Sequence, residues 1–174
     1  MRPFYYAAVS LLLAVGCAKD QAVRLFEMRY INHEFAVPAG HSPISGAMVY
    51  QKIIPSFYEE NRTANDVAEG EVASIRPYFA TMTSISGLDF SYLSSISIRV
   101  CESSAAACTE FDEVFFLGDL YRRRLTQLRL DPGLQTKTSL LQQDGFKLEV
   151  VLFPAEVTPY AMDFQLDFAF EAVK

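Results

Sequence analysis

The segment from residue 162 to residue 171 constrains the fold of this chain most strongly. Its apolar side chains alternate strictly with mostly polar ones. Because successive side chains of a β-strand point to opposite faces, this period of two predicts a strand with one buried and one solvent-facing side. The apolar positions are Met162, Phe164, Leu166, Phe168 and Phe170.

Several other segments have similar patterns and predict about seven to nine strands. They are residues 23–31, continued by 35–37 past a bulge, and residues 73–85, 96–101, 113–117, 126–130 and 146–153. Pro77 predicts an edge position or a bulge in its strand, because proline cannot donate a ladder hydrogen bond. Helical spacing between residues 134 and 141 predicts one short helix. The expected fold is an all-β antiparallel β-sandwich, immunoglobulin-like in broad architecture.

Strand pairing is predicted only for neighbours in sequence. Residues 146–153 and 162–171 are expected to form a hairpin, and residues 96–101 and 113–117 a second one. The region 44–65 fits either a helix or an extended chain, and Pro55 favours the extended form. Residues 61–70, rich in Asn, Asp, Glu and Gly, are expected to form an exposed loop.

Length and charge indicate one acidic domain. The chain has 174 residues and a formal net charge of -6. A chain of this size typically forms a single domain, expected here over residues 23–174. The excess of acidic residues disfavours binding to nucleic acid.

The N-terminal residues resemble the signal of a bacterial lipoprotein. Residues 4–15 carry no charge and are too few to span a bilayer, which is typical of a removable export signal. The sequence Leu-Ala-Val-Gly-Cys at residues 13–17, in which this run ends, resembles a lipobox, in which Cys17 becomes the acylated N-terminus. This resemblance implies a signal peptide over residues 1–16 and a lipidated tether over residues 17–22. An ordinary secretory signal cleaved near Gly16 is the alternative.

The residues after Cys17 indicate where in the cell envelope the protein is expected to lie. Ala18, by its resemblance to the sorting pattern of Gram-negative lipoproteins, implies the outer membrane. Residues 17–20 also partly resemble the surface-export signal of Bacteroidetes lipoproteins, and residues 119–174 weakly resemble uncharacterised sandwich lipoproteins of that group. The expected location is therefore the outer membrane, with a lipid such as palmitate as the anchor, on the periplasmic face or at the cell surface.

Cys101 and Cys108 are expected to form a disulfide. Once Cys17 is assigned to lipid, these two of the three cysteines remain, flanking a loop of small residues between two predicted strands. Such a bond suits an oxidising compartment.

No catalytic or metal-binding motif is complete. His33-Glu34 begins like a zinc-protease helix, but Val37 stands where the second histidine is required. Ser42 resembles a hydrolase nucleophile, but Ile44 replaces the second glycine of that turn. We therefore expect a non-enzymatic protein without metal or cofactor.

Two sets of residues are candidates for binding. Arg122 and Arg124 would contact a protein partner or lipid phosphate, or would merely solubilise a sheet edge. Tyr50, Phe57 and Tyr58 would bind a ligand, because exposed aromatic rings stack on sugars and anchor interfaces. The sequence thus predicts a membrane-anchored accessory or structural subunit with an envelope protein partner. The alternative is a surface-exposed module that binds a glycan or another ligand.

Overall fold

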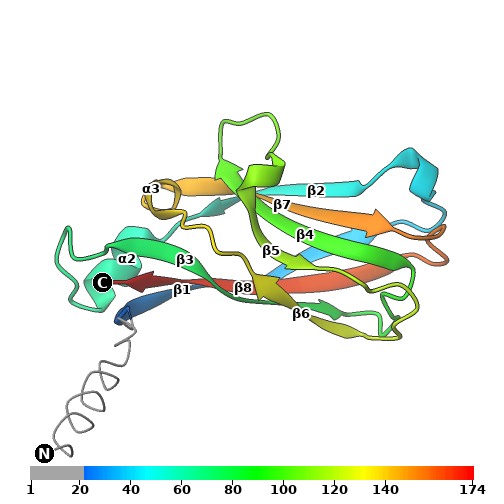
Figure 1. The fold of residues 1–174 in the computed structure, drawn as a ribbon, viewed down its shortest axis with the longest axis horizontal. Helices are drawn as coiled ribbons and strands as arrows, with labels where there is room; N and C mark the ends of the chain where they lie inside the picture. Colours follow the sequence, from blue (N-terminus) through cyan, green and yellow to red (C-terminus); the bar gives the residue numbers. More distant parts are fainter. Residues whose placement is uncertain (1–21) are drawn as a thin grey trace, which may run out of the picture.

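A computed structural model describes residues 22–174 (Figure 1). Cys17 and the predicted signal peptide lie outside the described residues. The strands are β1 (Arg24–Val37), β2 (Met48–Pro55), β3 (Ser74–Ser84), β4 (Leu93–Glu102), β5 (Glu113–Leu117), β6 (Gln127–Pro132), β7 (Gly145–Pro154) and β8 (Met162–Val173). The helices are α2 (Tyr58–Ala64) and α3 (Thr138–Leu141), with 3₁₀ turns η2 (Pro43–Ser45) and η3 (Glu110–Asp112).

All eight strands belong to one antiparallel sheet, with the order β1-β8-β3-β6-β5-β4-β7-β2. The ladder between β5 and β6 is short, so the sheet has two halves of four strands joined by a narrow bridge. The sheet curls until it nearly closes on itself, and Phe35 of β1 reaches Tyr50 of β2, the opposite edge strand. The prediction of a mainly antiparallel β fold is confirmed. The immunoglobulin-like sandwich stays a prediction.

Aromatic side chains of β8 fill the space between the two halves. The Phe168 ring stacks on Tyr30 of β1, with 4.9 Å between ring centroids. It also lies 6.5 Å from the ring of Phe146 on β7, in the other half. These rings are buried, as the alternation of residues 162–171 predicts.

Both predicted irregularities are present at the expected places. The β1–β8 register shifts between Tyr30 and His33, where Asn32 adopts a left-handed φ of 60°. The β3–β8 register shifts between Pro77 and Phe79. The hairpin of β4 and β5 is also confirmed.

The predicted hairpin of residues 146–153 and 162–171 is wrong. β7 pairs with β4 and β2, whereas β8 pairs with β1 and β3 in the other half. The connection between them crosses the gap, and Thr158 within it is fixed to the segment after β1. The Thr158 hydroxyl donates to the Pro38 carbonyl and accepts from the His41 amide, both at 2.8 Å.

Two further segments differ from expectation. Residues 48–55 are extended as predicted, but the chain then forms α2, so part of the expected loop 61–70 is helical. Residues 122–124 form part of a turn rather than a strand, because Arg122 has a φ of 65°. The fold therefore has two short α-helices among residues 22–174, not one.

Truncation of Phe168 tests the importance of the aromatic core. We expect Phe168→Ala to lower the free energy of unfolding by about 3–5 kcal/mol, because it removes a buried ring and leaves a cavity. Phe111→Ala is the control, since 81% of Phe111 is exposed. Urea denaturation monitored by circular dichroism measures both, and similar losses in the two variants would contradict this account.

Candidate functional site

The loops gather at two ends of the sheet (Figure 1). The chain enters at residue 22 beside the C-terminus, and α2 lies at this same end, which we call the entry end. Four connections lie at the opposite end: residues 38–47, 85–92, 118–126 and 155–161. We call these four connections the far-loop surface.

Hydrogen bonds join these four loops into one unit. The Gly40 amide donates to the Thr158 carbonyl at 2.8 Å, which links the first and last loops. The Tyr160 hydroxyl donates to the Asp89 carbonyl at 2.6 Å, which links the last loop to residues 85–92. A surface held in this way loses little conformational entropy when a partner binds.

Arg122 and Arg124 are both exposed and lie on the far-loop surface. The Arg122 amide donates to the Ser91 carbonyl at 2.8 Å, so the turn is attached to its neighbour. The guanidinium of Arg122 lies 4.9 Å from the centre of the Tyr121 ring. A fixed turn, rather than the sheet edge considered from the sequence, presents both arginines.

The far-loop surface also carries exposed apolar side chains. Five of them have exposed fractions between 41% and 97%. They are Ile44, Ile85, Tyr121, Leu125 and Val157. The surface therefore combines apolar area with consecutive arginines in a protein whose net charge is -6.

The predicted ligand residues are separated. Tyr50 is half-buried, with its ring 6.1 Å from Phe35 and 6.3 Å from Phe164. Tyr58 is buried near the entry end, whereas Phe57 beside it is 49% exposed. The structure thus keeps Phe57 and Tyr58 together and places Tyr50 elsewhere.

The disulfide between Cys101 and Cys108 is present and closes a loop held by buried charges. The Lys147 ammonium donates to the carbonyls of Ala105 and Ala106 in this loop. The Glu149 carboxylate accepts from the Cys108 amide at 2.9 Å. The chain-entropy model gives the disulfide about 2.5 kcal/mol for a loop of this size.

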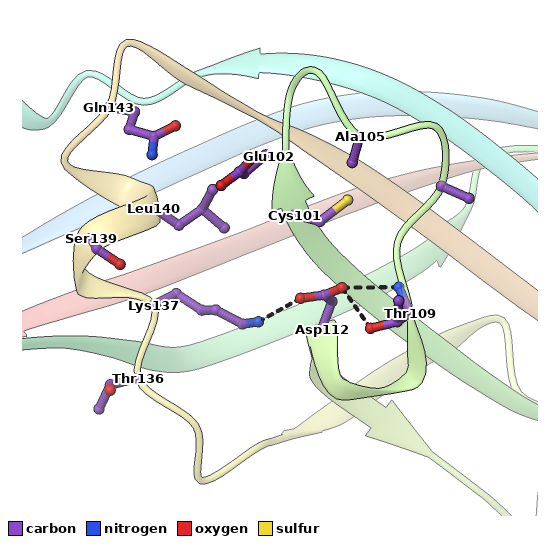
Figure 2. A pocket seen from close by; sticks show the side chains of 11 residues that line it. Cys101, Glu102, Ala105, Thr109, Asp112, Thr136, Lys137, Ser139, Leu140 and Gln143 are labelled. Carbon is purple, nitrogen blue, oxygen red and sulfur yellow. Dashed lines mark hydrogen bonds and ion pairs between the residues drawn. The ribbon is translucent and has the colours of Figure 1, made fainter.

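A pocket of about 500 Å³ lies between this loop and the α3 segment (Figure 2). Thr109 and Asp112 line the side of the disulfide loop and η3, while Lys137 and Gln143 come from the α3 side. Leu140 supplies an apolar part of the lining. The pocket is thus built from segments separated in sequence and is mostly polar.

An ion pair spans this pocket. The Lys137 ammonium lies 3.0 Å from the Asp112 carboxylate, and both side chains are largely buried. Burial alone would raise the pKa of Asp112, but hydrogen bonds from Thr109 and Lys137 outweigh it and lower that pKa. Asp112 therefore stays ionised at neutral pH, and its contact with Lys137 fixes the pocket walls relative to each other.

Sequence reasoning missed Lys137 and Gln143 as pocket residues. Neither belongs to a motif, and no spacing links them to the cysteine loop, so the sequence held no signal for them.

The two histidines contact different neighbours. The His41 ring contacts the Gly46 carbonyl at 2.9 Å, and the His33 ring lies beside Phe168. Burial, followed by the charge of Lys52, lowers the pKa of His33. In the same part of the chain, no three His, Cys, Asp or Glu side chains gather as metal ligands would. No helix there has the length and apolar character needed to cross a membrane.

Comparisons with known proteins give no family assignment. No protein-family model matches the sequence, and no curated protein is significantly similar to it.

Acid should remove the contribution of Asp112 to stability. A carboxyl group with a lowered pKa stabilises the fold above its unfolded pKa, and this contribution is lost as the pH falls through the folded pKa. At pH 7 we expect Asp112→Asn to cost up to about 1 kcal/mol. The difference from wild type should shrink below the ordinary pKa of 3.8.

Urea denaturation at pH 7 and at low pH measures this difference. Asp131→Asn is the control, because the exposed Asp131 side chain makes no ion pair within residues 22–174. A cost for Asp112→Asn that stays constant with pH would be inconsistent with this role.

Proposed function

We propose that this protein is a lipid-anchored envelope lipoprotein that acts as an accessory subunit by docking a protein partner on its far-loop surface. The observation that carries the proposal is the position of that surface, at the end of the sheet opposite residue 22. A domain tethered at its entry end would present this surface away from the membrane.

The tether would be short. Six residues lie between Cys17 and Arg24, where β1 begins, and the seven steps from Cys17 to Arg24 reach about 24 Å when fully extended. The 14 residues of β1 extend over about 45 Å toward the far loops. An anchor at Cys17 would therefore hold the entry end close to the lipid, while the far loops project toward other envelope proteins.

The chemistry of the far-loop surface supports a protein as the partner. Arginine and tyrosine are enriched among the residues that dominate binding energy at interfaces. Arg122 and Arg124 favour an acidic rim on the partner, because charge complementarity speeds association and selects the register. The exposed apolar side chains of the same surface would supply the centre of the contact.

The Cys101–Cys108 disulfide supports an exported location, since such bonds persist in oxidising compartments. The proposed site of action is the outer membrane, on its periplasmic face or at the cell surface. The proposed role is non-enzymatic and uses no cofactor.

We also infer that the two halves of the sheet serve as the layers of an immunoglobulin-like sandwich. Ring contacts across the space between them support this view: Tyr30 with Phe146 at 5.4 Å, and Phe115 with Phe170 at 5.9 Å. Loops at the end of such a sandwich are common binding sites because a rigid scaffold positions them.

Metabolic labelling tests the anchor. We expect the wild-type protein to incorporate labelled palmitate and Cys17→Ala to incorporate none, because Cys17 would carry the lipid. The control is the double variant Cys101→Ser and Cys108→Ser, which should keep the label. A wild-type protein without label would refute the anchor.

Capture from native membranes tests the docking surface. We expect the tagged protein, purified in mild detergent, to retain a stoichiometric envelope partner identified by mass spectrometry. The double variant Arg122→Glu and Arg124→Glu should lose at least about nine-tenths of it, because reversed charges would face an acidic rim.

The matched control reverses two exposed cations outside the far-loop surface, Lys52→Glu on β2 and Arg129→Glu on β6. Both are free of ion pairs among residues 22–174. Retention of the partner in this control, together with its loss in the arginine variant, supports docking at the far loops. Equal retention in both variants, or recovery of the protein alone, contradicts it.

A further inference from the structure

Two hollows at the α3 side of the molecule share the side chain of Gln143. The larger is the pocket of about 500 Å³ beside the disulfide loop (Figure 2). The smaller has about 250 Å³ and is lined by residues around the start of α2, including Phe57 and Tyr58. Because Gln143 borders both, the two hollows form one interrupted depression, which we call the Gln143 groove.

The larger hollow is lined by both hydrogen-bond donors and hydrogen-bond acceptors. The hydroxyl groups of Thr136 and Ser139 can each donate and accept, and so can the amide of Gln143. The Lys137 ammonium has three N–H groups, and it donates to the Asp112 carboxylate and the Phe111 carbonyl. Within residues 22–174 its third N–H has no partner and is open to a ligand.

Charge disfavours an ionic ligand here. Asp112 neutralises Lys137 at 3.0 Å, so an anion would meet no uncompensated positive charge and would face the exposed carboxylate of Glu102. A cationic ligand would gain only the exposed and solvent-screened carboxylate of Glu102, because Asp112 is already paired with Lys137. A neutral ligand with several hydroxyl groups can both donate hydrogen bonds to these side chains and accept hydrogen bonds from them. It brings no charge that would have to be removed from water.

The smaller hollow adds an aromatic surface. Phe57 is 49% exposed and has a left-handed φ of 56° where the chain enters α2. Its carbonyl accepts from the Asn61 amide at 3.1 Å and from the Asn61 side chain at 2.7 Å, which fixes this turn. An exposed ring on a fixed backbone is a suitable platform for the C–H face of a sugar.

We propose that the Gln143 groove binds a short neutral oligosaccharide. One sugar unit occupies the larger hollow, Gln143 contacts the linkage region, and another unit stacks on Phe57. The combined size falls within the range of ordinary ligand sites. This site is separate from the far-loop surface, so a test of sugar binding does not depend on the proposed docking role.

Ligand-observed NMR on the purified mature protein tests the site, with maltotriose, cellotriose and chitotriose as probes. We expect saturable binding of at least one trisaccharide. Gln143→Ala and Phe57→Ala should each weaken it by about tenfold, the effect of losing one good hydrogen bond or stacking contact. The matched controls are Gln135→Ala and Phe116→Ala, which change exposed residues outside both hollows.

Weaker binding in both groove variants with unchanged binding in both controls supports the proposal. Absence of saturable binding to all three sugars overturns it. Binding that is equal in all variants also overturns it, because the sugar would then occupy another place. Circular dichroism of each variant distinguishes a lost contact from a lost fold, and Phe57→Tyr, which keeps a ring, should restore binding.

Discussion

The packing of the β8 aromatic side chains between the two halves of the sheet supports everything else in this molecule. The hydrogen-bonded bridge between the halves is short, limited to β5 and β6. The halves therefore depend on contacts between their inner faces, above all those of Tyr30, Phe168 and Phe170 in one half with Phe146 of β7 in the other. Because β8 lies in the middle of its half, these rings also fix the strands that lead to both ends.

The sequence was informative wherever local geometry alone decides the outcome. Alternation of apolar and polar side chains predicted the β8 strand, and proline chemistry predicted the irregularity at Pro77. Pairing was harder, because alternation defines the buried face of a strand and not its neighbour. β7 and β8 both have alternating patterns, but their partners lie in different halves of the sheet, so the hairpin was wrongly predicted.

The binding surfaces were only partly predictable. Arg122 and Arg124 were identified as a cluster, but their turn depends on a left-handed residue that no glycine or asparagine marks. Phe57 and Tyr58 do line a hollow, whereas Tyr50 packs against the core. Lys147 and Glu149 have the spacing of solvent-facing residues, yet both are buried because the disulfide loop folds over them. Burial of a side chain by a segment distant in sequence leaves no local pattern from which that burial could be predicted.

The irregular edge strands of the sheet, β1 and β2, affect how closely copies of this protein could be crowded together. β1 and β2 have no partner on their outer sides within residues 22–174, and long free edges invite other chains to add strands. In β1 the register shift around Asn32 interrupts the row of backbone groups, and β2 carries Lys52 and ends at Pro55. Two-dimensional confinement at a lipid surface would raise the local concentration of such domains greatly. These interruptions would let neighbouring copies collide edge to edge without joining into a continuous sheet.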